Sequence, residues 1–206
     1  MESARWYLIE SADVVRLPWR NGRGVTRQIA LWPPDASFQQ LDFDWRVSAA
    51  GVVEDGPFSA FDGFDRALLV TSGEGLSVQH GDGRRARLRP LEPYSFRGDG
   101  DTWASLVGGP IDDLGVLVRR GVWRAELEVL RLSNRRARFE LGPGEHTLFH
   151  LLAGSALLRL EGEEEPMPLE GGDTGWVLPE SGGSAAELAG ADPRALGVTI
   201  RLRPAL

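Results

Sequence analysis

The stretch 68-LLVTSGEGL-76 decides the fold, because a similar stretch, 149-FHLLAGSAL-157, follows 81 residues further along the chain. In each stretch a largely apolar run ends at a glycine and a second short run follows, which is the pattern of a β-hairpin. The same offset, without a gap, places Phe96 on Val177. A hairpin, a turn and a strand repeated at one spacing predict two similar β units in one chain.

The rest of the chain indicates strands as well. Short runs of Val, Leu, Ile and aromatic residues recur between Gly or Pro, and no window of a dozen residues shows a helical stripe. Strict alternation in Arg136–Leu141 is typical of a half-buried strand. The run from Leu151 to Pro179, with an apolar strand ending at Gly and a later Glu-Gly-Gly-Asp turn, resembles the central segment of a cupin. We therefore predict an all-β bicupin with two jelly-roll-type β-barrel units.

The boundary between the two units is predicted near Gly121. Residues 1–120 would form an N-terminal cupin that carries a ligand pocket, and residues 121–206 a C-terminal cupin-like unit. The first expected strand, Trp6–Ile9, falls in the N-terminal unit. Exchange of a strand between the two units is left open.

The composition is that of an ordinary globular protein with an acidic balance. Of 206 residues, 42% are hydrophobic and 26% are charged, and the formal net charge is −7. This balance gives no general attraction to nucleic acid. The absence of cysteine excludes disulfides, thiol catalysis and thiolate metal sites. Because no apolar run reaches transmembrane length and the start lacks a signal-peptide layout, we expect a cytoplasmic protein that does not bind membranes.

The stretch 45-WRVSAAGVVEDGPFSAFDGFDR-66 holds more polar side chains than a plain β unit needs. In a strand, Arg46 and Ser48 share one face, and the apolar residues around them share the other. Arg66 returns at the start of the next apolar run, so two guanidinium groups are expected to converge on a small carboxylate. The structural alternative is that both arginines pair with neighbouring aspartates and tie a loop to the sheet.

The histidines do not supply a complete metal site. Cupin metal centres usually combine a His-x-His pair with a Glu and a later His. Here His146 and His150 are four residues apart, on one face of an expected strand, and no third histidine follows them. His80 lies in a turn-like segment, where a surface loop explains it. The sequence also lacks a serine-hydrolase elbow and a phosphate loop. We predict no metal, no cofactor and no catalytic residue set.

Several motifs of the first half together resemble the HutD/Ves family. They are Trp19–Thr26, Trp45–Ala50, Asp55–Ser59, Gly63–Arg66, Gly109–Asp113 and Arg119–Gly121. These motifs occur in order over nearly the whole first half, whereas the second half matches only as a generic cupin. The resemblance implies a bicupin fold, no assigned catalytic activity and, for the HutD branch, an association with bacterial histidine utilisation.

The resemblance also implies which side chains line a pocket in the N-terminal cupin. The implied ligand-binding residues are Asn21, Thr26, Arg46, Ser48, Asp55, Phe58, Ser59, Asp65, Arg66 and Asp113. Two departures from the family pattern bear on the identity of the ligand. Gln28 stands where the family commonly has Glu, and the family's Asn-x-Met element is Gly115-Val116-Leu117 in this chain.

Three functions remain open at this point. The first is a non-catalytic protein that binds a small carboxylate, with a regulatory or accessory role in histidine utilisation and with urocanate or formylglutamate as candidate ligands. The second is a cupin enzyme of the isomerase or lyase type acting on a small organic anion. Acid/base work needs a group that titrates near neutral pH, and only Asp55, Asp65 and Asp113 lie close to the arginines in sequence. The third is a structural or interaction protein with a vestigial pocket. A homodimer is also considered.

Overall fold

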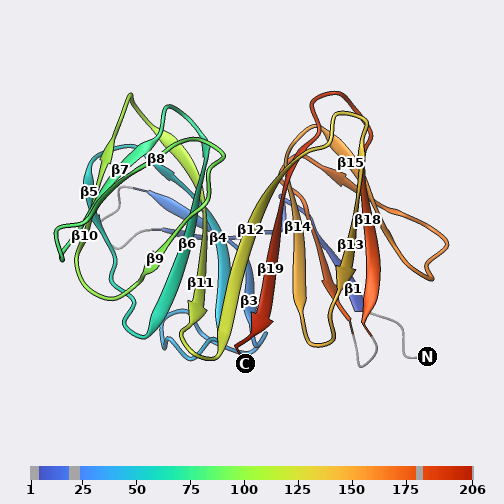
Figure 1. Cartoon of the computed structure of the whole chain (residues 1–206), viewed down its shortest axis with the longest axis horizontal. Helices are drawn as coiled ribbons and strands as arrows, with labels where there is room; N and C mark the ends of the chain where they lie inside the picture. The colour runs from blue at the N-terminus through green and yellow to red at the C-terminus, as the bar shows by residue number, and fades with distance from the viewer. Residues whose placement is uncertain (1–4, 19–23, 180–182, 206) are drawn as a thin grey trace. The chain divides into compact units, whose positions relative to one another are not determined.

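The computed structural model describes residues 5–18, 24–179 and 183–205, and within these residues it contains strands, turns and loops but no helix. The all-β prediction is confirmed. The described residues form two compact units, coloured along the chain in Figure 1. The N-terminal unit spans Val15–Trp123, and the C-terminal unit joins residues 5–14 to the described residues from Arg124 onwards. In the described residues no helix is long and apolar enough to span a bilayer.

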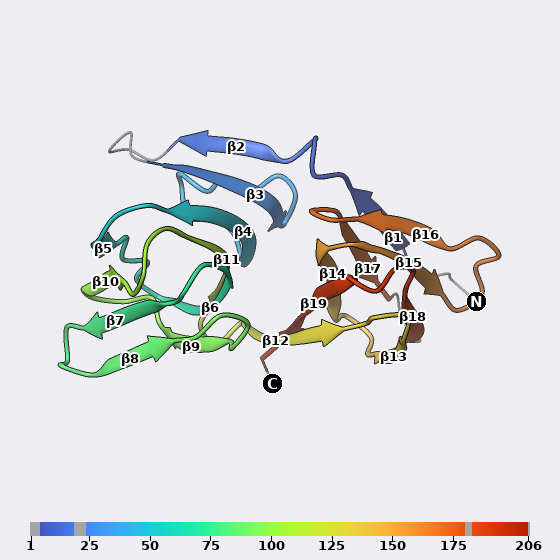
Figure 2. The ribbon, with the colours of Figure 1, turned by 90° about the horizontal axis from the view of Figure 1, so that it is seen from above.

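The N-terminal unit consists of two antiparallel sheets. The six-stranded sheet has the order β2-β3-β4-β11-β6-β9, and the four-stranded sheet has the order β5-β10-β7-β8. Figure 2 shows β7 and β8 across this unit from β2 and β3. The strands are β2 Val15–Pro18, β3 Val25–Trp32, β4 Trp45–Val52, β5 Gly56–Phe58, β6 Phe64–Ser72, β7 Leu76–His80, β8 Arg85–Leu88, β9 Tyr94–Arg97, β10 Thr102–Leu106 and β11 Ile111–Arg119.

The C-terminal unit repeats this plan. Its five-stranded sheet has the order β1-β17-β14-β19-β12, and its four-stranded sheet has the order β13-β18-β15-β16. The strands are β1 Arg5–Ile9, β12 Trp123–Arg131, β13 Arg136–Leu141, β14 His146–Ala153, β15 Ser155–Leu160, β16 Met167–Glu170, β17 Thr174–Leu178, β18 Ser184–Gly190 and β19 Leu196–Pro204. The repeated hairpin of the sequence corresponds to β6 and β7 in one unit and to β14 and β15 in the other.

The first strand of the chain belongs to the C-terminal unit. Strand β1 pairs antiparallel with β17 over its whole length, from Arg5 opposite Leu178 to Ile9 opposite Thr174. The sequence placed Trp6–Ile9 in the N-terminal unit and left strand exchange open. The hydrophobic pattern of a strand does not predict which strand it pairs with, because the edge strand of any sheet can form hydrogen bonds with its backbone.

Each unit buries its core between its two sheets. In the N-terminal unit, Leu68 and Val70 of β6 pack in one buried cluster with Val78 and Leu88 of the opposite sheet. In the C-terminal unit, Phe149 of β14 packs in a larger buried cluster that includes residues of β13, β15, β17 and β18. Alternate residues of β6 and β14 therefore face the interior of their units.

Candidate functional site

The inner face of the six-stranded sheet carries polar side chains in three successive rows. Paired residues of adjacent antiparallel strands point to the same face, and the face repeats every second residue. The rows across β4, β11 and β6 are Arg46, Leu117 and Arg66; then Ser48, Gly115 and Leu68; then Ala50, Asp113 and Val70. Because Leu68 and Val70 belong to the interior cluster, all three rows face the interior.

Arg46 is held on this face by two contacts. Its side chain is buried, its guanidinium carbon lies 4.0 Å from the centre of the Phe38 ring, and its Nε donates a hydrogen bond to Oε1 of Gln28 at 3.0 Å. Gln28 pairs with Ser48 across β3 and β4 and therefore joins the second row. Among the described residues, the terminal nitrogens of Arg46 make no hydrogen bond. Several donors of its planar fork thus remain available.

Arg66 is surrounded by aromatic rings. Its guanidinium carbon lies 5.0 Å from the ring centre of Phe58, 5.7 Å from that of Phe61 and 5.3 Å from that of Phe96. Its Nη1 donates to the backbone oxygen of Ser59 at 3.1 Å. Cation–π contacts hold the guanidinium in place without using its hydrogen-bond donors. Nε and Nη2 have no hydrogen-bond partner in the part of the chain that the structure describes.

The two arginines form a pair of like charges in an interior position. Burial lowers the pKa of Arg46 to about 10, with a further contribution from the charge of Arg66. Burial also lowers the pKa of Arg66 to about 10, whereas the charge of Asp113 acts to raise it. Within the described residues neither guanidinium has a carboxylate within salt-bridge distance. The ion pairs of the structural alternative are therefore not formed there.

Asp113 is the carboxyl group of this face. It is 8% exposed, and no hydrogen bond or ion pair to its carboxylate is formed by the described residues. Burial raises the pKa of Asp113 to about 7, Arg66 acts to lower it, and Asp112 acts to raise it further. An unpartnered buried carboxyl group is costly unless it is protonated or meets a ligand. Asp113 is thus a group that titrates near neutral pH on the same interior face as the two guanidinium groups, and the charge of Arg66 acts on it.

His80 is a buried residue of the interior, and the prediction of a surface turn was wrong. It ends β7, is 6% exposed, and its Nε2 lies 3.0 Å from the hydroxyl of Tyr94 on the opposite sheet. Its Nδ1 lies 3.2 Å from Oγ1 of Thr102, and its ring centre is 5.1 Å from that of Phe96. Burial lowers its pKa, with a further contribution from Arg84. The alternation of Leu76, Val78 and His80 with polar residues was the sequence signal that placed it on the inner face.

Some implied site residues have other positions. Asp55 is exposed and accepts a hydrogen bond from the backbone nitrogen of Leu106 at 2.8 Å. Asp65 precedes Arg66 in β6, so it points to the other face, where Nε of Arg120 donates to it at 2.7 Å. Ser59 is exposed and contributes its backbone oxygen. Both aspartates therefore have structural partners, and the Arg120 pair explains the acidic residue beside Arg66.

The remaining implied residues are Thr26, Ser48, Phe58 and Asn21. Thr26 pairs with Ala50 and lies in the row of Asp113, and Ser48 lies in the row of Gly115. Phe58 contacts Arg66 as described. Asn21 lies outside the described residues.

The histidines of the C-terminal unit face away from its core cluster. His146 and His150 alternate with Thr147 and Phe149 along β14, and Phe149 belongs to the core. Nδ1 of His150 lies 2.8 Å from Oγ1 of Thr174, and burial lowers the pKa of His146 to about 4. Among the described residues, no group of three or more His, Cys, Asp and Glu side chains is arranged to hold a metal ion.

The fold and the interior face define a two-barrel protein of the bicupin class. Comparison with known proteins narrows this class: the HutD family model matches residues 11–195, and the chain belongs to the HutD family. A relative from Pseudomonas putida, an uncharacterized 21.2 kDa protein in the hutC 3′ region, is 32% identical over 177 residues, which cover 79% of this chain and 90% of the relative.

Solved structures agree with this assignment. A conserved protein of unknown function from Pseudomonas aeruginosa PAO1 superposes with a TM-score of 0.85 at 27% identity, covering 97% of this chain and 99% of the other. HutD from Pseudomonas fluorescens SBW25, solved in a formate condition, superposes with a TM-score of 0.78 at 28% identity, with the same coverage of both chains. The likeness therefore extends over both barrel units.

Proposed function

We propose that this protein binds a small carboxylate at Arg46 and Arg66 without transforming it, and that it has a regulatory or accessory role in histidine utilisation. One observation carries the proposal: the buried guanidinium of Arg46 and the half-buried guanidinium of Arg66 face one interior, and within the described residues no carboxylate pairs with them. A guanidinium fork matches a carboxylate in shape and charge and forms two charge-assisted hydrogen bonds with it.

The electrostatics of the arginine pair favour an anionic ligand. The like charges of Arg46 and Arg66 repel each other on a largely buried face, which lowers the stability of the unliganded protein. The positive potential between them attracts an anion, and a bound carboxylate replaces repulsion with two attractions. The rings of Phe38 and Phe58 keep both guanidinium groups ordered before binding, which lowers the entropy cost of association.

The connection to histidine utilisation rests on the family. The Pseudomonas putida relative is described by its position in a hutC region, and a solved neighbour is a HutD protein. Urocanate and formylglutamate are the candidate ligands, because both are small carboxylates of that pathway. A cytoplasmic location and a homodimer belong to the same proposal.

Arg46→Lys tests the proposal. Lysine keeps the charge but loses the planar fork, so we expect the dissociation constant for urocanate or formylglutamate to rise about tenfold or more. Arg46→Ala should weaken binding further, by a few kcal/mol on the order typical of a buried unpaired charge. Isothermal titration calorimetry measures the affinities, and thermal unfolding measures stability. Because Arg46 faces a like charge, neither substitution should lower the melting temperature much.

Arg119→Lys is the matched control in the same unit. Arg119 also lies over an aromatic ring, 5.1 Å from the centre of Phe64, but its donors are used by Asp44 and by the backbone oxygens of Leu41 and Phe43. This substitution should lower stability and leave affinity unchanged. If Arg46→Lys instead behaves like Arg119→Lys, destabilised but binding normally, Arg46 is a structural residue and the proposal fails.

Asp113 favours a second candidate, an enzyme that moves a proton on a bound carboxylate. A carboxyl group whose pKa lies at about 7, on the same interior face as an anion-binding pair, meets the requirement for a general acid or base at neutral pH. Incubation of each binding ligand in deuterated water, followed by NMR, distinguishes the two candidates. Solvent exchange or isomerisation that Asp113→Asn abolishes would favour the enzyme, and unchanged ligand would favour the binder.

A further inference from the structure

The three inner rows define a path between the arginines and Asp113. Successive rows are two residues apart on each strand, which is about 6.7 Å at the usual rise of a strand. On β11 the order is Leu117 in the arginine row, Gly115 in the middle row and Asp113 in the third row. A molecule that extends from the guanidinium groups toward Asp113 therefore passes over Gly115.

Gly115 places no side chain on this path. A Cβ atom built there would meet Cδ1 of Leu68 at 3.8 Å and the backbone oxygen and Oγ of Ser48 at 3.9 Å, which are ordinary contact distances. Its backbone is not in the left-handed region that requires glycine. A glycine inside a strand costs stability relative to residues with a side chain. Neither crowding nor backbone conformation requires glycine at this position, and the evident effect of the glycine is that no side chain lies on the path.

Asp113 marks the far end of the path. More than nine-tenths of this residue is buried, and no described residue donates a hydrogen bond to its carboxylate. Beyond it, the side chains on the same face of β4 and β11 are Val52 and Ile111 of the apolar core. A ligand group that reaches Asp113 thus meets a hydrogen-bond acceptor backed by hydrocarbon, which suits an N–H or O–H donor or an ammonium group.

We infer that the site selects elongated carboxylates whose far end carries a hydrogen-bond donor, that Gly115 provides the room for their chain, and that Asp113 receives the donor. This inference rests on the proposed carboxylate binding and adds the class of ligand. Short carboxylates contact only the arginines and bind weakly. Long carboxylates without a donor leave Asp113 unpartnered and bind with intermediate affinity.

The test compares acetate, pentanoate and 5-aminopentanoate by calorimetry at a mildly alkaline pH. We expect the affinity to rise in that order, with about a tenfold advantage of 5-aminopentanoate over pentanoate from a charge-assisted contact. Gly115→Val should weaken 5-aminopentanoate and pentanoate about tenfold or more by filling the path, and leave acetate unchanged within about twofold. Asp113→Asn should remove most of the advantage of 5-aminopentanoate, and it should strengthen pentanoate binding by up to about fivefold because the opposing charge is gone.

Gly51→Val is the control for the general effect of replacing a glycine by valine in this sheet. Gly51 lies in β4 on the other face, and a Cβ there would meet only the carboxylate end of Asp112 at 3.4 Å and a backbone oxygen at 4.0 Å. It should not change any of the three affinities. Equal affinity of wild type for all three probes, unaffected by Gly115→Val, would overturn this inference and leave carboxylate binding standing. Failure of wild type to bind any probe, or urocanate and formylglutamate, would overturn the proposed function itself.

Discussion

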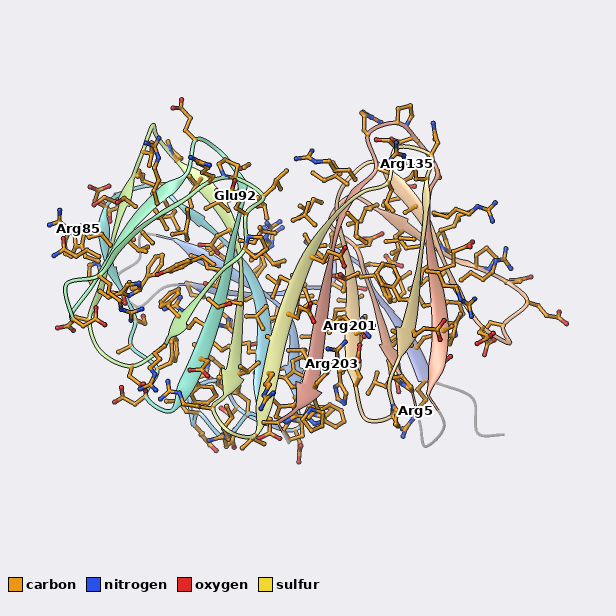
Figure 3. All side chains as sticks on the ribbon, viewed as in Figure 1. Arg5, Arg85, Glu92, Arg135, Arg201 and Arg203 are labelled. Atoms are coloured by element: carbon orange, nitrogen blue, oxygen red, sulfur yellow. The ribbon has the colours of Figure 1, made fainter. Side chains whose placement is uncertain are left out.

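Both barrel units carry two arginines at one end of the inner face, but among the described residues only the C-terminal unit places a carboxylate side chain between them. There, Glu145 is almost fully buried and receives hydrogen bonds from Nε of Arg201 at 2.6 Å and from Nε of Arg203 at 2.8 Å. Both arginines project from β19 (Figure 3). Oγ1 of Thr147 donates a third hydrogen bond to Glu145, at 2.7 Å.

The equivalent position of the N-terminal unit lacks such a carboxylate among the described residues. The 81-residue offset that aligns Leu68 with Phe149 also aligns Arg66 with Thr147. In the C-terminal unit, burial acts to raise the pKa of Glu145, but the hydrogen bonds from Arg201, Arg203 and Thr147 hold it below its ordinary value. The internal carboxylate of the C-terminal unit holds its arginine pair in place, whereas the arginine pair of the N-terminal unit is the one that we propose binds a carboxylate from solution.

The largest effect is expected from Glu145→Ala. Removal of this buried carboxylate takes away its charge-assisted hydrogen bonds from Arg201 and Arg203, which are themselves partly exposed, so the free energy of unfolding should fall by about 3 kcal/mol. Denaturant unfolding at neutral pH measures it. Because the folded-state pKa of Glu145 is lowered, its contribution is present at neutral pH and is lost as the pH falls through that lowered value. The wild-type and variant stabilities should therefore approach each other in acid.

Added acetate tests whether a free carboxylate can replace that of Glu145. If the Glu145 carboxylate does in the C-terminal unit what a ligand does in the N-terminal unit, acetate should restore part of the stability of Glu145→Ala. Glu126→Ala is the control, because Glu126 is an exposed partner of Arg203 at 3.4 Å, and its loss should cost less than about 0.5 kcal/mol. Equal losses of stability in the two variants would mean that Glu145 contributes no more than an exposed ion-pair partner.

Two strand glycines, Gly175 in the C-terminal unit and Gly115 in the N-terminal unit, differ in how closely neighbouring atoms approach them. A Cβ at Gly175 would lie 2.4 Å from Cδ2 of Leu158, a fully buried side chain, whereas a Cβ at Gly115 meets nothing closer than 3.8 Å. Gly175→Ala should therefore cost about 1–3 kcal/mol through overpacking. Gly115→Ala should be neutral or stabilise by about 0.5 kcal/mol. Chemical denaturation of both variants checks this, and equal losses would show that the N-terminal interior is as tightly filled as the C-terminal one.

The sequence predicted the fold well because the fold depends on local pattern. Alternation and glycine punctuation identified most strands, and the repeat identified two similar units. The strands that were not identified are instructive. Strand β18 is rich in alanine, which has little preference for strands, and β5 consists of Gly56-Pro57-Phe58, which reads as a turn. Strand β12 does alternate, with Trp123, Ala125, Leu127 and Val129 on one face, so its signal was present.

The candidate site was predictable only in part. The facing of Arg46 and Arg66 follows from period-two alternation, and the structure places them in one row. The sequence does not show that no described carboxylate pairs with them. That depends on Asp65 pointing to the other face, where it pairs with Arg120, and on Asp44 pairing with Arg119. The buried position of His80 was missed because a Gly-rich turn follows it. The raised pKa of Asp113 depends on burial, which no short motif encodes.

The smallest expected effect is the pH dependence of ligand binding. It involves a second difference between the units, namely the pKa of the buried carboxyl group in each. Asp113 has a pKa raised to about 7, mainly by burial, so it becomes charged as the pH rises from about 6 to about 8. Glu145, with a lowered pKa, stays ionised over that range, and burial lowers the pKa of His80, which favours its neutral form. Among the residues described, Asp113 is the carboxyl group of the site that changes charge over this range.

A negative charge at Asp113 opposes a carboxylate held at Arg46 and Arg66. The affinity for pentanoate, which is fully ionised throughout, should fall about fivefold between pH about 6 and about 8, which corresponds to roughly 1 kcal/mol of repulsion. Asp113→Asn should make the affinity independent of pH in this range. The same variant should gain stability over wild type at the upper end, because a carboxyl group with a raised folded-state pKa loses stability as the pH rises from its ordinary value to the raised one. Calorimetric titrations of both proteins with pentanoate across this pH range measure the effect. If Asp113→Asn shows the same pH profile as wild type, the carboxyl group of Asp113 does not face the bound anion.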